Sequence, residues 1–215
     1  MSSLAAHERS ALCAAALQHG PEAPTLCGDW DVRDLVVHLL VREGHPVASA
    51  GIFVSPLAGV RRRVEASLRE SDFTHLVATL RHGPPLLSLF SVPKLGGIAN
   101  IAEFFVHHED IRRAQPDWSP RAQTERTEDT LWRMLTVLGR ATSLQAPTGV
   151  VMRRSDVEGS VSRLRKAPDG AGDVEVSGPP SELMLFAYGR QEHSLVELDG
   201  DPADMDALHA ASLGI

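Results

Sequence analysis

The sequence predicts a two-part chain, in which an all-helical bundle (residues 1–118) precedes a small α+β domain (residues 119–215). Three observations support this fold class. Apolar residues recur at helical spacing through the first part, whereas short β-type runs begin only after Pro147. Pro116 and Pro120 break the chain between the two patterns. A chain of 215 residues is long enough for one large or two small domains, so the division is physically reasonable.

Glycine, proline and capping residues mark the ends of the helices expected in the first part. Gly20 follows the first helix, and Asp31 is a favourable N-cap for the second. Pro46 follows the second helix, and the pair Pro84-Pro85 follows the fourth. The expected helices span residues 3–18, 31–44, 57–68, 72–80 and 98–114.

The second part begins with a helix and then changes to short strands. Leu131, Leu135 and Leu138 form the apolar stripe of a helix over residues 127–140. A second helix starts at the proline pair before residue 181, where the missing N–H costs little, and a last helix starts near Asp201. The expected strands span residues 149–153, 160–164, 173–177 and 194–198.

The charge of the chain argues against nucleic acid as a partner. The net charge is −7, whereas binding to phosphates requires a basic patch. The arginine runs at residues 61–63, 112–113 and 153–154 are short, and we interpret them as solvated faces. No nucleic-acid partner is therefore expected.

The sequence also lacks the usual signals for a membrane or for export. No apolar run approaches the roughly 20 residues that span a bilayer, and no signal peptide is visible, so a cytoplasmic location is expected. Cys13 and Cys27 are the only cysteines and do not form a disulfide framework. We interpret both as small, buried free thiols without a catalytic role.

Two segments carry candidate metal ligands. Glu103, His107 and Asp110 share one face of a helix, because each residue turns the helix by about 100°. The surrounding segment is largely apolar, where such side chains are costly to bury without partners. His38 lies in a separate apolar helical run. Two histidines and one glutamate form a catalytic type of zinc site with an open position, although other first-row metals also fit.

The segments around these residues resemble a known family. LCGDWDVRDLVVHL (residues 26–39) is similar to the C-x-x-W-x-V-R-D-L-x-x-H-L segment of the mycothiol-dependent maleylpyruvate isomerase family. NIAEFFVHHEDIRR (residues 100–113) resembles the second signature of that family, E-x-x-x-H-x-x-D. VSGPPSEL (residues 176–183), with GR at 189–190 and LDGD at 198–201, resembles its C-terminal domain.

The resemblance implies a fold, a metal site and a thiol cosubstrate. The implied fold is a DinB-like metal-binding four-helix bundle followed by a sterol-carrier-like α+β domain. The implied metal ligands are His38, Glu103 and His107, with Zn²⁺ as the expected divalent metal. The implied cosubstrate is the low-molecular-weight thiol mycothiol. The doubled histidine of HHED (residues 107–110) is closer to a branch known mainly as metal-binding proteins.

Two further side chains are candidates for catalytic roles. Asp110 could orient His107, or a bound water, by a hydrogen bond without binding the metal itself. Arg42 lies one helical turn beyond His38 and could bind a substrate carboxylate, or it could be exposed. His45 is expected on the same helical face as His38, either at the pocket mouth or at a fraying helix end.

Neighbouring side chains are assigned to packing or to the surface. His108 points away from Glu103 on the helical wheel and is not expected to be a ligand. Glu109 is expected at the surface. Trp30 and Val32 are expected to pack at the start of the second helix, and the pair at residues 104–105 is expected in the core.

These features lead to a main functional hypothesis and two alternatives. The main hypothesis is a metal-dependent enzyme that uses a mycothiol-type thiol for isomerisation or S-transfer on a small electrophilic substrate. The expected partners are therefore a small-molecule substrate and a low-molecular-weight thiol. A bound divalent metal lowers the pKa of a thiol, and the thiolate is the nucleophile. The alternatives are a non-catalytic metal-binding or sensing protein and a metal-dependent hydrolase on the same bundle.

Overall fold

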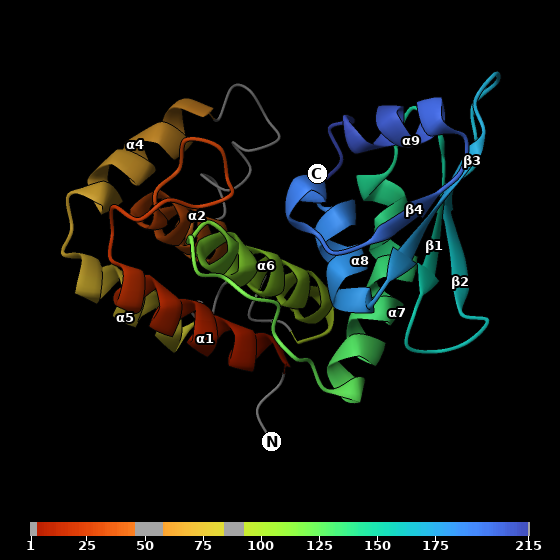
Figure 1. Cartoon of the computed structure of the whole chain (residues 1–215). Coiled ribbons are helices and arrows are strands. Elements are labelled where there is room, and N and C mark those ends of the chain that lie inside the picture. The colour runs from red at the N-terminus through yellow and green to blue at the C-terminus, as the bar shows by residue number, and fades with distance from the viewer. Residues whose placement is uncertain (1–3, 46–57, 84–92, 215) are drawn as a thin grey trace. The chain divides into compact units, whose positions relative to one another are not determined.

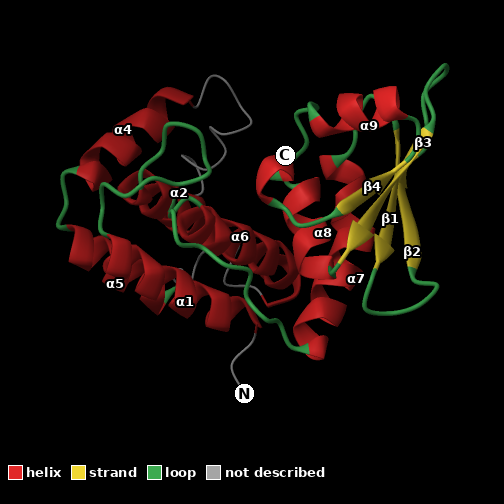
Figure 2. Ribbon diagram, viewed as in Figure 1, coloured by secondary structure: helices red, strands yellow, loops and turns green. Residues whose placement is uncertain are grey.

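The computed structural model describes residues 4–45, 58–83 and 93–214 of the chain. It divides into two compact units, Met1–Ser119 and Pro120–Ile215 (Figure 1). In the described residues of the first unit the regular elements are helices, whereas the second unit combines helices with a four-stranded sheet (Figure 2). The predicted order, helical and then mixed, is therefore confirmed, and the predicted boundary after residue 118 lies next to this division.

Two helices of the first unit begin at aspartates that cap them. The side chain of Asp31 accepts a hydrogen bond from the backbone N–H of Asp34, and Asp72 does the same for His75. The breaks predicted at Pro46 and at residues 84–85 lie outside the described residues. The helices are α1 (Leu4–His19), α2 (Val32–Gly44), α4 (Ala58–Arg69), α5 (Phe73–His82) and α6 (Pro93–Arg113).

Helix α6 begins earlier than expected, at Pro93 instead of near residue 98. Proline suits the first turn of a helix, because the N–H groups there have no intrahelical partner. Gly96 and Gly97 lie inside the helix, where each glycine costs about 1 kcal/mol relative to alanine. The glycine pair therefore does not mark the start of the helix.

The core of the first unit lies between α1, α2, α5 and α6. Phe104 and Phe105 are fully buried, as predicted, and so is Val32. A charged pair at the edge of this core joins two helices, since Arg9 of α1 donates two hydrogen bonds of 2.5 Å to the carboxylate of Glu43 in α2. Apolar packing and this bidentate pair together hold the helix that carries His38.

The second unit contains the elements predicted for it, with shifts of a few residues at their ends. Its helices are α7 (Glu125–Thr142), α8 (Pro180–Ala187) and α9 (Pro202–His209), and a short 3₁₀ helix, η3, spans Gln191–His193. Its strands are β1 (Gly149–Arg154), β2 (Val161–Arg165), β3 (Asp173–Gly178) and β4 (Glu197–Asp199).

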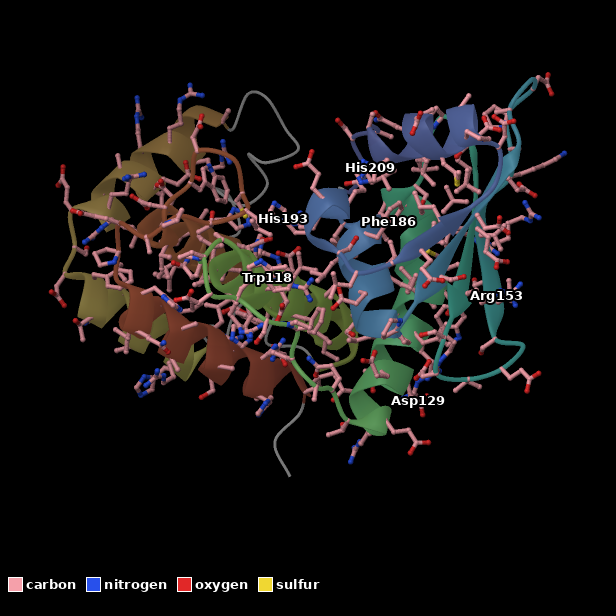
Figure 3. The ribbon with its side chains drawn as sticks, in the orientation of Figure 1. Trp118, Asp129, Arg153, Phe186, His193 and His209 are labelled. Atoms are coloured by element: carbon pink, nitrogen blue, oxygen red, sulfur yellow. The ribbon has the colours of Figure 1, made fainter. Side chains whose placement is uncertain are left out.

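The sheet of the second unit has the strand order β2-β1-β3-β4. Strands β1 and β3 are parallel, whereas β2 and β4 are antiparallel to their neighbours. Side chains alternate between buried and partly exposed along β1 and β3, because α7 and α8 cover one face. Figure 3 shows Phe186 of α8 inside the unit and Arg153 of β1 on the outer face, where it pairs with Glu175.

No helix in the described part of the chain is long and apolar enough to cross a membrane.

Candidate metal centre

His107 of α6 is the central side chain of the candidate site. Its Nδ1 lies 2.8 Å from Oδ2 of Asp110, and its Nε2 lies 3.4 Å from Oε2 of Glu103. The two contacts lie on opposite ring nitrogens, because Glu103 and Asp110 are one turn before and one turn after His107 on the same helical face. The contact predicted between Asp110 and His107 is therefore present.

His38 reaches the same place from α2. Its ring centroid lies 5.6 Å from that of His107, and the two rings meet edge to face. One ligand atom from each of His38, Glu103 and His107 lies within 4.8 Å of the other two. Ligand atoms bound at about 2.0–2.2 Å around a tetrahedral zinc lie roughly 3.5 Å apart, so a small contraction would seat a metal. The three predicted ligands are thus brought together, and their chemistry fits a divalent metal.

Burial and neighbouring charges set the protonation of these groups. Burial and the charge of His107 lower the pKa of His38 to about 4. Burial alone would raise the pKa of Glu103, but the hydrogen bond and charge of His107 and the charge of Arg42 outweigh it and lower that pKa to about 2. Burial also opposes protonation of His107, yet its hydrogen bonds, led by that to Asp110, raise its pKa well above the usual value. At neutral pH the metal-free site therefore holds a carboxylate, a neutral imidazole and an imidazolium.

Arg42 and Asn100 link the two ligand-bearing helices. Arg42 lies one turn after His38 on α2, and Asn100 lies one turn before Glu103 on α6. Nη1 of Arg42 donates a hydrogen bond of 2.8 Å to Oδ1 of Asn100, and its Nε lies 3.6 Å from Oε2 of Glu103. Arg42 is 8% exposed, so the alternative that it is a surface residue is wrong. Its buried guanidinium contacts a candidate metal ligand directly.

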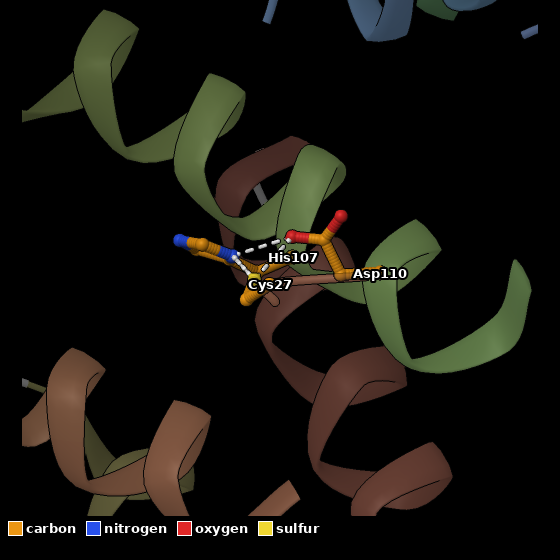
Figure 4. Close-up of side chains that lie close together, drawn as sticks. All are labelled: Cys27, His107 and Asp110. Atoms are coloured by element: carbon orange, nitrogen blue, oxygen red, sulfur yellow. Dashed lines mark hydrogen bonds and ion pairs between the residues drawn. The ribbon is translucent and has the colours of Figure 1, made fainter. Parts of the chain in front are cut away.

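Cys27 lies at the Asp110 side of His107, which the sequence did not indicate. Its Sγ lies 3.1 Å from Oδ2 of Asp110 and 3.7 Å from Nδ1 of His107 (Figure 4). Cys27 belongs to the loop between α1 and α2, so helical spacing could not place it next to α6. Both cysteines are free thiols, as expected, but Cys27 is half-buried instead of buried, whereas Cys13 is fully buried in the core.

A cavity of about 430 Å³ adjoins His38. Trp30 lines it, and the centroid of its ring lies 5.1 Å from that of His38, a place beside the site that its predicted packing role did not indicate. Arg61 and Arg62 of α4 also line it, although their run was interpreted as a solvated face. Nε of Arg61 is buried and has no hydrogen-bond partner among the described residues. The arginine-rich sequence of α4 did not predict that these residues line a cavity, because the cavity depends on how α4 packs against α2.

Other predictions near the site have mixed outcomes. His108 points away from the ligands, as expected, and its Nδ1 lies 3.0 Å from Oε2 of Glu8 in α1. Glu109 is 1% exposed, so its predicted surface position is wrong. It is buried because Arg112 and Arg113 both donate to its carboxylate.

The interpretation of the arginine runs as solvated faces is wrong for Arg113 and Arg154. Arg113 is 4% exposed, and it pairs with the carboxylate of Glu109. Arg154 is 5% exposed and contacts Asp129 and Asp156. Each is buried with partners that balance its charge.

His45 does not join the candidate metal ligands. It is the C-cap residue of α2, is exposed, and lines a separate cavity together with residues of α5 such as His75 and Leu76. The predicted position at the end of α2 is confirmed. The alternative position at the mouth of the pocket beside His38 is not supported by this placement.

Comparisons of the chain with models of protein families, with curated proteins and with solved structures found no significant match.

Proposed function

We propose that the chain is a metal-dependent enzyme that uses a low-molecular-weight thiol of the mycothiol type for isomerisation or S-transfer on a small electrophilic substrate. The observation that carries this proposal is the convergence of His38, Glu103 and His107 from two helices. Two histidines and a carboxylate leave a coordination position open, as catalytic metal sites do. The motifs around these ligands resemble the mycothiol-dependent maleylpyruvate isomerase family, with a DinB-like bundle and a sterol-carrier-like second domain, which supports the choice of thiol.

The residues of the chain have separate tasks in this proposal. His38, Glu103 and His107 would hold the divalent metal, for which zinc is the first choice. When bound, such a metal lowers the pKa of a thiol, so that the nucleophilic thiolate is available at neutral pH. Asp110 accepts the Nδ1 proton of His107, so the proton that a metal would displace is the one on Nε2, the nitrogen beside Glu103. Arg42 holds the carboxylate of Glu103 in place.

The cavity beside His38 gives a substrate access to these residues. It offers the indole of Trp30, the apolar side chain of Val37 and the guanidinium of Arg61. An aromatic face and a cation can orient a small molecule with an apolar part and a negative group. The substrate position is therefore assigned to the side of His38 that faces α4.

Calorimetric titration of the full chain with mycothiol tests the proposal. The zinc-loaded protein should bind the thiol and release a proton, and binding should strengthen as the pH rises toward neutrality. The metal-free protein and the Glu103→Gln variant should not bind it, and glutathione serves as the comparison thiol. If the zinc-loaded protein binds no thiol at millimolar concentration, the thiol proposal fails, and the sensing or hydrolytic alternatives take precedence.

A further inference from the structure

A second cluster of metal-ligand types lies on the other side of His107. Sγ of Cys27, Oδ2 of Asp110 and Nδ1 of His107 are 2.8 to 3.7 Å apart (Figure 4). Asp110 is fully buried, and Cys27 and His107 are half-buried. The cluster therefore brings together a thiol, a carboxylate and an imidazole where few waters can compete.

The geometry does not suit a cysteine nucleophile with a histidine base. In a catalytic triad the acid orients one ring nitrogen, while the other nitrogen takes the proton of the nucleophile. Here both Cys27 and Asp110 meet Nδ1, and Nε2 faces Glu103 instead. One nitrogen cannot serve both partners of a triad, so ligand binding is the better interpretation of the cluster.

The loop that carries Cys27 is held against α6 by its backbone. The N–H of Leu26 donates to the carbonyl of Asp110, and Nε2 of Gln115 donates to the carbonyl of Pro24. Within the loop, Oγ1 of Thr25 accepts from the N–H of Cys27 and donates to the carbonyl of Trp30. The thiol is thus preorganised toward Asp110, which lowers the cost of closing around a ligand.

The three atoms are spaced as ligands of one ion would be. Around a metal bound at about 2.0–2.3 Å, neighbouring ligand atoms lie roughly 3 to 4 Å apart. The separations of 3.7 Å and 3.1 Å from Cys27 Sγ already match, and only the 2.8 Å between His107 and Asp110 must widen slightly. A thiolate ligand favours soft, thiophilic metals over those that prefer oxygen.

We propose that Cys27, Asp110 and Nδ1 of His107 form a second metal site, selective for thiophilic ions and mutually exclusive with the site at His38 and Glu103. A neutral imidazole has one lone pair, so His107 can serve one site at a time. In the second arrangement the ion replaces the thiol proton of Cys27 and the Nδ1 proton of His107, and both protons leave to solvent. The remaining ring proton of His107 sits on Nε2, which lies 3.4 Å from the carboxylate of Glu103. The mutual exclusivity rests on the proposed function, because it assumes a metal site at His38 and Glu103. The existence of the site at Cys27 does not depend on the proposed function.

Titration of the metal-free full chain with Cd²⁺ tests the second site, with the thiolate-to-metal charge-transfer absorption in the ultraviolet as readout. The wild-type protein should bind one Cd²⁺ with this absorption, and so should Glu103→Gln and Cys13→Ala. Cys27→Ser should lose it, although Cd²⁺ can still bind at the oxygen and nitrogen ligands. Absorption that persists in Cys27→Ser, or that is lost in Cys13→Ala alone, overturns the site.

Addition of Cd²⁺ to zinc-loaded protein tests the exclusivity. Each Cd²⁺ bound with charge-transfer absorption should release one Zn²⁺, measured with a zinc-sensitive dye, and Cys27→Ser should lack the absorption. Retention of both ions on one chain would contradict the exclusive use of His107. If the protein binds Cd²⁺ through Cys27 but never binds zinc, the proposed function fails while the second site stands.

Discussion

At the scale of single residues, the two nitrogens of His107 decide how the candidate site works. Nδ1 meets the buried carboxylate of Asp110 at 2.8 Å, and Nε2 meets Glu103 at 3.4 Å. A buried carboxylate that accepts the Nδ1 proton fixes the tautomer and makes the other nitrogen a better ligand. His108 is adjacent in sequence but pairs with Glu8, so it is held away from the ligands.

The pH dependence of the metal-free protein should report the state of His38. The pKa of His38 is about 4 in the folded chain, below its usual value of 6.5. The unfolded chain therefore binds a proton at His38 more readily, and the free energy of unfolding falls as the pH drops below 6.5. The pKa of His107 is raised, so its contribution is fully present below pH 6.5. The pKa of Glu103 is lowered to about 2, so its contribution to stability is fully present above pH 4.5. Between pH 4.5 and pH 6.5, His38 is therefore the one of these three residues that lowers the stability of the folded chain as the pH falls.

Urea unfolding of the metal-free wild-type protein and of His38→Gln tests whether His38 lowers the stability as the pH falls. The free energy of unfolding should fall between pH 6.5 and 4.5 more steeply in the wild type, by up to about 2 kcal/mol. Parallel declines in the two proteins would show that His38 is not buried as a neutral group.

At the scale of secondary structure, the site depends on side-chain contacts between α2 and α6. Helical periodicity predicted that Glu103, His107 and Asp110 share a face, because this relation lies within one helix. The same periodicity placed Phe104 and Phe105 in the core, where both are buried. It could not predict that Cys27, in a loop, contacts Asp110, since that contact depends on tertiary packing. Nor could it predict that Glu109 is buried, because its partners Arg112 and Arg113 were assigned to the surface.

The contact of Arg42 with Asn100 and Glu103 should be measurable as metal affinity. Arg42→Met keeps the volume but removes the guanidinium, so the carboxylate of Glu103 loses its restraint. We expect zinc affinity to fall about 10- to 100-fold, the effect typical of residues that orient metal ligands. Arg33→Met is the matched control, because Arg33 lies on the same helix and donates to the carbonyls of Arg69 and Ser71 instead. Equal affinities in wild type and Arg42→Met would remove Arg42 from the site.

At the scale of the whole molecule, all three candidate ligands lie in the first compact unit. The predicted order of helices followed by strands is confirmed, and Pro116 and Pro120 marked the break between the two patterns in the sequence. The chain division is therefore readable from sequence, since proline and the change of periodicity are local signals. The cavity between α2 and α4 could not be predicted from the sequence, because the arginines that line it belong to a run that also suits a solvated helix face.

A fragment of residues 1–119 should fold and bind metal without the second unit. Its helices share their own core, and the candidate ligands His38, Glu103 and His107 are within it. We expect helical circular dichroism and a zinc affinity within about threefold of the full chain, since a domain with its own core can fold alone. A fragment that stays unfolded in the presence of zinc would show that the second unit completes the core of the first.

The central claim is that His38, Glu103 and His107 hold one divalent metal, and metal analysis of the full chain tests it most directly. The wild type should bind about one equivalent of zinc, and His107→Ala should lose most of it. His108→Ala, the matched neighbour, should retain the metal, although loss of the contact with Glu8 should lower its stability by roughly 3 kcal/mol. Equal loss of zinc in both variants, or a wild type that binds none, would contradict the assignment.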